Sequence, residues 1–129
     1  MLLEKPFSAT VKQLELFLDI SGDRQSIHDP KLEDKAILPA NFILTLIPAC
    51  VQKIIHVETK TKVMTVGYQS IMFRHPVHLN EPLSVSCSIK KVVVRQQRVF
   101  VFSDIEITSE LTNVLAVTLR VTDCYDNGL

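Results

Sequence analysis

The sequence predicts an α+β domain in which an antiparallel sheet packs on one long helix. Three observations favour this class. Helical spacing of apolar residues is confined to the chain before Val57, β-branched residues in alternation dominate after it, and the helices precede the strands as a block. A length of 129 residues is enough for one domain with its own core, and we take residues 1–129 as that domain.

Composition narrows the classes of function. The 14 basic and 14 acidic side chains cancel, so we expect no nucleic-acid partner, because affinity for phosphates comes from excess Lys and Arg. The apolar run 37–55 is broken by prolines and polar residues, so we expect no membrane span. Cys50, Cys87 and Cys124 cannot all pair, which favours buried thiols in the reducing cytoplasm. A 47% apolar content favours a homodimer that covers part of the surface.

The N-terminal residues predict a short edge strand and a first helix. Residues 1–7 form the edge strand, with Pro6 near its end. Thr10 and Gln13 have the spacing of a capping box, so a helix is expected over residues 10–20. Gly22 can take the left-handed conformation that ends such a helix.

Two further helix starts follow. Asp29-Pro30 can cap and begin a short helical turn that we expect to run through Lys35. Leu38-Pro39 begins the longest helix, which we expect over residues 39–53; it is apolar nearly all round, as suits a central element covered by a sheet. Pro48 falls inside this helix and is expected to kink it or remove one hydrogen bond.

The second half of the chain reads as strands joined by polar turns. Five strands are expected, near residues 62–69, 70–75, 83–94, 99–108 and 114–124. Gly67 is expected to mark a bulge or bend, and residues 95–98 form a turn. With each strand beside the next, the sheet would be a meander.

The loop after the first helix carries the most specific motif. It reads Ser21-Gly22-Asp23-Arg24-Gln25-Ser26-Ile27-His28-Asp29-Pro30, with an acid and an imidazole five residues apart. This motif resembles the S-G-D-x-N-P-x-H-x-D-P pattern of the MaoC-like dehydratases, hot-dog folds that include the (R)-specific enoyl-CoA hydratases. Within that family, the motif resembles most the nodulation-protein N-like branch. Phe73-Arg74-His75-Pro76-Val77 and Glu81-Pro82-Leu83 resemble that family's R-F-x-x-P-V strand end and G-D-x-L turn.

The resemblance implies a hot-dog domain that pairs as a homodimer. It also implies reversible hydration of 2-enoyl thioesters of coenzyme A or acyl carrier protein, or dehydration of 3-hydroxyacyl thioesters, as in fatty acid metabolism. The family's catalytic aspartate and histidine fall on Asp23 and His28. A carboxylate and an imidazole within reach of one water can deprotonate it and relay the proton. No cofactor is implied, and the other histidines lack the spacing of a metal site.

Substrate contacts are expected at the start of the long helix. Negative charge accumulates on the thioester oxygen during the reaction, and free N–H groups at a helix N-terminus can receive it. Pro39 has no N–H, so we expect the amides of Ala40 or Asn41 to act as donors. Gly22 and Phe42 are the other expected substrate contacts.

Departures from the family pattern leave alternatives open. Pro39-Ala40 stands where the family has His-Gly, and alanine is disfavoured if that turn needs a positive φ. Gln25-Ser26 replaces Asn-Pro. These changes favour a catalytically silent acyl-thioester binder or interaction subunit, and a hot-dog thioesterase is a further alternative. Four basic residues form what we call the basic turn: Lys90, Lys91, Arg95 and Arg98. This turn could bind the phosphates of coenzyme A or a phosphopantetheine arm, or it could be a solvent-exposed hairpin.

Overall fold

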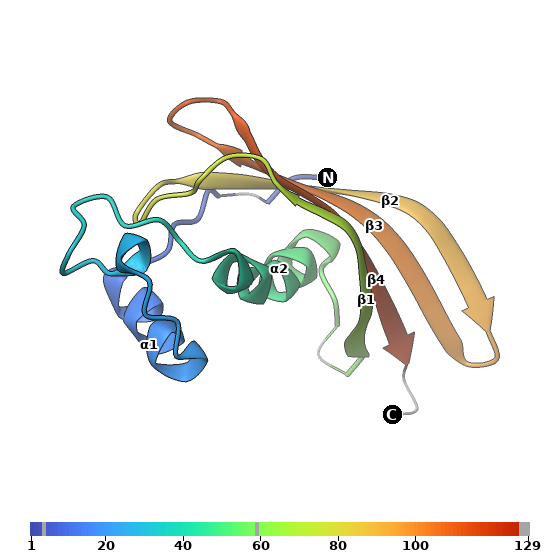
Figure 1. Ribbon diagram of the computed structural model, residues 1–129. Coiled ribbons are helices and arrows are strands. Elements are labelled where there is room, and N and C mark those ends of the chain that lie inside the picture. The colour runs from blue at the N-terminus through green and yellow to red at the C-terminus, as the bar shows by residue number, and fades with distance from the viewer. Residues whose placement is uncertain (4, 59, 127–129) are drawn as a thin grey trace.

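The structure, a computed structural model, describes residues 1–3, 5–58 and 60–126. Its elements in chain order are helix α1 (Val11–Ser21), 3₁₀ turn η1 (Ser26–His28), helix α2 (Ala40–Ile55) and strands β1 (Lys62–Phe73), β2 (Leu83–Arg95), β3 (Arg98–Ser109) and β4 (Leu115–Asp126). Figure 1 shows the sheet curving over α2, with α1 beyond the N-terminal end of α2. The predicted α+β class and its central helix are confirmed.

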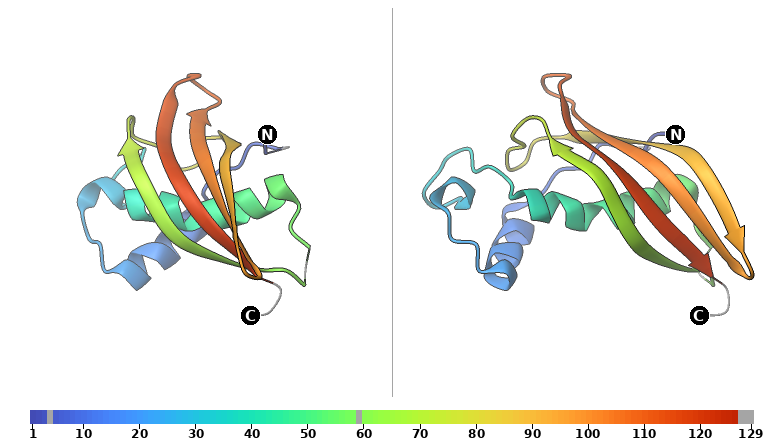
Figure 2. Two further views of the ribbon diagram at one scale, coloured as in Figure 1. Left: turned by 90° about the vertical axis from the view of Figure 1, so that its right-hand side faces the viewer. Right: turned by 45° about the vertical axis from the view of Figure 1, so that its right-hand side comes forward.

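The sheet has the strand order β1-β4-β3-β2, and all neighbours are antiparallel. Strands β2, β3 and β4 form a meander, but β1 joins at the far side of β4, so the expectation of a complete meander is wrong (Figure 2). The described N-terminal residues lie beside β2, where the amides of Leu3 and Phe7 donate to the carbonyls of Val85 and Leu83, each at 2.9 Å. They form isolated bridges and not the continuous edge strand that was expected. The edge at β2 is therefore partly covered, whereas no described segment of the chain pairs with the outer edge of β1.

Strand β1 joins two segments that the sequence predicts as separate strands. Its pairing with β4 shifts register between Thr65 and Gly67 and again between Gln69 and Met72, which confirms the expected bulge at Gly67. Ser70 lies in the second irregularity with φ +53°. Each shift adds residues on β1 without ending the pairing. The strand therefore bends twice and continues.

The core lies between the concave face of the sheet and α2. Helix α2 buries a stripe of six residues, namely Phe42, Ile43, Ile47, Cys50, Val51 and Ile54. From the sheet, Ile105, Leu119 and Val121 are each at most 4% exposed. Cys50, Cys87 and Cys124 are buried and unpaired, as predicted. Burial of this apolar surface fixes the position of α2 and hence of its N-terminus.

The helical turn predicted over residues 29–35 forms, but only as a single turn. The Asp29 carboxylate accepts the amide of Lys31 at 2.9 Å, as a helix cap does, and the Asp29 carbonyl accepts the amide of Glu33 at 3.0 Å. No regular helix follows over residues 30–35. The amide of Ile37 then donates to the carbonyl of Ile27 at 2.8 Å, so the chain returns on itself within ten residues.

Helix α1 ends as the sequence predicts, and this end can be tested. Thr10 and Gln13 form the capping box, and Gly22 adopts φ +72° with its amide bound to the carbonyl of Leu18 at 3.0 Å. We expect Gly22→Ala to lower the free energy of unfolding by about 1 kcal/mol in chemical denaturation, because a Cβ disfavours positive φ.

The matched control is Gly67→Ala. An added Cβ meets nothing within 4 Å at either glycine, but only Gly22 has a positive φ. The control variant should therefore be as stable as the wild type or slightly more stable. Equal losses in the two variants would contradict a role for the left-handed cap.

Candidate active site

Residues 36–38 form a short extended segment between the η1 turn and residues 77–79. On one side the amide of Ile37 donates to Ile27. On the other side the amide of Leu38 donates to the carbonyl of Val77 at 2.7 Å, and the amide of Leu79 donates to the carbonyl of Ala36 at 2.9 Å. Backbone hydrogen bonds on both flanks therefore fix the carbonyl of Ile37.

That carbonyl holds the imidazole of His28. The ring Nδ1 lies 2.6 Å from the carbonyl oxygen of Ile37, and the side chain is 12% exposed. A carbonyl only accepts hydrogen bonds, so Nδ1 carries a proton. In the neutral ring, Nε2 then presents a lone pair, as a general base requires.

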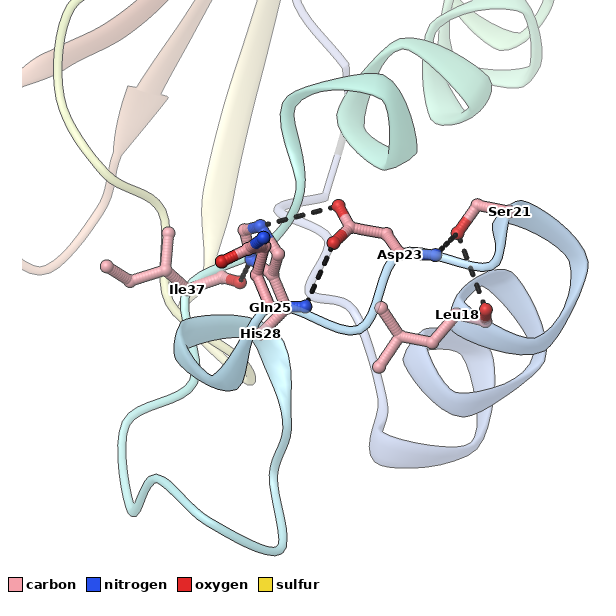
Figure 3. Close-up of polar contacts among 6 residues, drawn as sticks. All are labelled: Leu18, Ser21, Asp23, Gln25, His28 and Ile37. Carbon is pink, nitrogen blue, oxygen red and sulfur yellow. Dashed lines mark hydrogen bonds and ion pairs between the residues drawn. The ribbon is translucent and has the colours of Figure 1, made fainter.

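Asp23 is oriented by its own loop (Figure 3). Its amide donates to the hydroxyl of Ser21 at 3.2 Å, and its Oδ1 accepts the amide of Gln25 at 3.1 Å. This local turn directs Oδ2 toward Nε2 of His28, at 3.7 Å. One carboxylate thus both caps the loop and faces the imidazole.

The two facing atoms suit the activation of water. A separation of 3.7 Å is too long for a direct hydrogen bond, and an ionised carboxylate and the Nε2 of a neutral ring are both acceptors. A water that donates one proton to each satisfies both. Its oxygen then carries increased negative character, and either acceptor can take a proton as the oxygen attacks an electrophile.

The start of α2 offers free donors near this pair. The amides of Ala40, Asn41 and Phe42 have no acceptor among the described residues. Ala40 follows Ile37 by three residues, which places it within about 11 Å along the chain. Pro39 has φ −58° and Ala40 has no positive φ, so alanine is unstrained at this turn and the conformational objection to it does not hold.

Two other predicted contacts have clear structural roles. The ring of Phe42 is 4% exposed and lies 5.1 Å from the ring of Phe17, measured between centroids, so it joins α1 to α2. Gly22 ends α1 directly before Asp23 and thereby sets where the loop begins. Both residues therefore help to place the pair.

The basic turn lies far from the pair within one chain. It forms the tip of the β2–β3 hairpin, at the opposite end of the molecule from α1 (Figures 1 and 2). Arg98 pairs with Asp126 at 2.9 Å, and Lys91 lies over the ring of Phe102 at 5.7 Å. The fold therefore does not bring this basic turn to Asp23 and His28 of the same chain.

Two hollows of the surface also lie away from the pair. One, of about 390 Å³, is at the C-terminal end of α2 beside Lys53 and His56. The other, of about 380 Å³, is on the sheet beside Asp104 and Arg120. Neither is lined by Asp23 or His28. Among residues 1–3, 5–58 and 60–126, no group of three His, Cys, Asp or Glu side chains is placed to bind a metal ion, and no helix is long and apolar enough to cross a membrane.

Sequence reasoning missed the group that orients His28. It is a main-chain carbonyl, and every residue type carries one, so no residue pattern marks it. The nearest signal is the extended stretch before Leu38-Pro39, since a residue that precedes proline is biased toward extended conformation.

Comparisons with known proteins agree on the fold. No protein-family model and no curated protein matches this chain. Three solved structures are similar to it over nearly their whole length. The first is a monoamine oxidase regulatory protein from Archaeoglobus fulgius, with a TM-score of 0.77 and 15% identity over 98% of this chain and 89% of that chain. The second is the (R)-hydratase from A. caviae involved in PHA biosynthesis, with a TM-score of 0.73 and 15% identity over 95% of this chain and 92% of that chain. The third is the C-terminally truncated HadBC (3R-hydroxyacyl-ACP dehydratase) complex from Mycobacterium tuberculosis, with a TM-score of 0.73 and 17% identity over 96% of this chain and 94% of that chain.

At these identities the likeness shows the fold. The chain has the hot-dog fold of the (R)-hydratases and MaoC-like dehydratases, as the motif resemblance implies. The closer likeness to the nodulation-protein N-like branch stays a prediction.

The tautomer of His28 can be tested without substrate. In ¹⁵N NMR spectra, at a pH where the ring is neutral, we expect the proton on Nδ1 and none on Nε2, because Nδ1 donates to Ile37. The exposed ring of His75, which has no hydrogen bond from its imidazole to the described residues, serves as an internal reference and should show both tautomers. A proton on Nε2 of His28 would contradict the geometry.

Proposed function

We propose that this chain is a MaoC-like hydratase or dehydratase that adds water reversibly to 2-enoyl thioesters. The observation that carries the proposal is the pair of facing atoms, Oδ2 of Asp23 and Nε2 of His28, at 3.7 Å. The second polar atom of each side chain is bound to the backbone, so both groups are oriented before substrate arrives. Preorganisation of this kind lowers the cost of reaching the transition state.

In the proposed reaction, water lies between the two side chains. Asp23 positions it and takes one proton as the oxygen forms a bond to C3 of the enoyl group. Asp23 passes this proton to Nε2 of His28, which delivers it to C2 and returns to its neutral form. One hydrogen of water thus ends on carbon and the other stays in the new hydroxyl. The amide of Ala40, with that of Asn41 beside it, holds the thioester oxygen while it carries negative charge.

The structural neighbours support the reaction class. Two of them are named as an (R)-hydratase and as a 3R-hydroxyacyl-ACP dehydratase, and each covers more than nine-tenths of this chain. The carrier of the acyl group is proposed to be coenzyme A or acyl carrier protein. Three buried, unpaired cysteines support a location in the reducing cytoplasm.

We also propose that two copies of this chain pair along β1. A free strand edge is a template for another strand, and the outer edge of β1 is unpaired in the described chain. Met64 and Val66 on this strand are 47% and 48% exposed, so the strand carries apolar side chains that a second copy could cover. Two neighbours are also named as complexes, HadBC and ChsH1-ChsH2.

The activity is tested by loss of enoyl absorbance with a short substrate such as crotonyl-CoA. We expect Asp23→Asn and His28→Ala each to lower kcat by roughly 10²- to 10⁴-fold, the range typical for loss of a general acid or base. Asp29→Asn is the matched control, because Asp29 makes the same kind of local turn through its carboxylate but has no imidazole partner. That variant should keep the wild-type rate.

Two outcomes would replace the proposal with another function. Release of free thiol without loss of the enoyl group would identify a thioesterase. Binding of acyl-CoA that is equally tight in wild type, Asp23→Asn and His28→Ala, with no turnover in any of them, would identify a silent binder.

The dimer is tested by analytical ultracentrifugation. Val66→Lys should yield monomers, because a lysine on a strand edge opposes pairing with another strand. Val94→Lys is the control, since Val94 is 67% exposed on the β2–β3 hairpin, away from β1. A wild-type monomer, or equal dissociation in both variants, would contradict pairing along β1.

A further inference from the structure

We propose that Glu81 and Ser109 are positioning residues for His28, acting through the backbone segment 77–79. This inference rests on the proposed function, because it assigns these two residues a part in the same reaction. Neither residue lies in the motif that carries Asp23 and His28.

Glu81 ties the turn before β2 to the end of β3. Its Oε2 accepts the backbone amide of His78 at 2.8 Å, and its Oε1 accepts the hydroxyl of Ser109 at 2.6 Å. The imidazole Nδ1 of His78 is 3.6 Å from Oε2. The Glu81 side chain is 11% exposed and Ser109 is 4% exposed. The carboxylate therefore holds the backbone at His78 against the sheet.

The charge of Glu81 is maintained by these contacts. Burial alone would raise the pKa of the carboxyl, but the amide of His78, the hydroxyl of Ser109 and the nearby imidazole outweigh it and lower the pKa. The carboxylate is therefore ionised at neutral pH. An ionised group accepts stronger hydrogen bonds than a neutral one, so the hydrogen bond from the His78 amide to Glu81 is strengthened.

The restraint continues from His78 to His28 through short contacts. Residues 77–79 pair with residues 36–38 through the 2.7 Å and 2.9 Å bonds described above, with Ile37 directly opposite His78. The carbonyl of Ile37 points to the other side and binds Nδ1 of His28 at 2.6 Å. A displacement of the His78 backbone thus moves the one hydrogen bond that orients the imidazole.

Stability alone does not explain a carboxylate that is only 11% exposed at this place. Desolvating an ionised group is costly, and a well-packed apolar side chain is often as stable or more stable. What an apolar side chain cannot do is accept the amide of His78 and the hydroxyl of Ser109 at the same time. The geometry at Asp23 and His28 is sensitive to small shifts, since a displacement of 1 Å can cost about 10²-fold in rate.

The test compares Glu81→Ala and Glu81→Gln with Asp104→Asn. Asp104 is the matched control: it accepts two hydrogen bonds from Arg120, at 2.7 and 3.2 Å, on another part of the sheet, and Arg120 lowers the pKa of its carboxyl. Each variant is measured by hydration of crotonyl-CoA, by the ¹⁵N signals of the His28 ring and by chemical denaturation.

We expect Glu81→Ala to lower kcat by about 10- to 10²-fold with little change in KM, and to shift the ¹⁵N signals of His28. Glu81→Gln should restore most of the rate, because its amide oxygen still accepts the His78 N–H. Asp104→Asn should leave both kcat and the His28 signals unchanged.

Several outcomes would overturn the proposal. One is a Glu81→Ala variant with wild-type kcat and wild-type His28 signals; another is the same loss of kcat in Asp104→Asn. If Glu81→Ala does not fold, Ser109→Ala decides by the same two readouts; it removes the 2.6 Å bond to Glu81 and a long 3.4 Å bond from the amide of Thr112. If the wild type does not hydrate enoyl-CoA, the proposed function fails, and the His28 signals alone show whether Glu81 positions the ring.

Discussion

The hydrogen bond between Nδ1 of His28 and the carbonyl of Ile37 is the contact on which the candidate site depends. It fixes the ring in one orientation and leaves Nε2 free to face Asp23. The bond is only as rigid as the segment 36–38, which is held by backbone pairing on both flanks. The His28 side chain, although it comes from an irregular part of the chain, is therefore held by backbone that is itself fixed by hydrogen bonds.

The fold links this contact to the hydrophobic core. Helix α2 is fixed by burial in the concave face of the sheet, and its first residue, Ala40, follows Ile37 by three residues. The free amides at the start of α2 and the imidazole of His28 therefore belong to one continuous, well-packed piece of chain. Asp23 is placed from the other direction, by the left-handed end of α1 at Gly22. The core thus positions both the pair and the donors expected to face the thioester oxygen.

Local patterns in the sequence were sufficient to predict the two helices on either side of the site. The capping box at Thr10, the glycine that ends α1 and the apolar stripe of α2 each depend on neighbours in sequence, and each is confirmed. Long-range pairing accounts for the failures. The helical turn after Asp29 does not extend further, and the chain returns so that Ile37 pairs with Ile27. Strand β1 joins β4 instead of its sequence neighbour. The carbonyl of Ile37 was not predictable, because its role comes from the fold and not from a residue type.

The central claim, that Asp23 and His28 converge on one oxygen atom of the substrate or water, is tested most directly by a crystal structure with 3-hydroxybutyryl-CoA, the product of hydrating crotonyl-CoA. The account predicts that the C3 hydroxyl lies within hydrogen-bond distance of both Oδ2 of Asp23 and Nε2 of His28. A hydroxyl bound elsewhere, or an Asp23 carboxylate turned away from the imidazole in the complex, would contradict it.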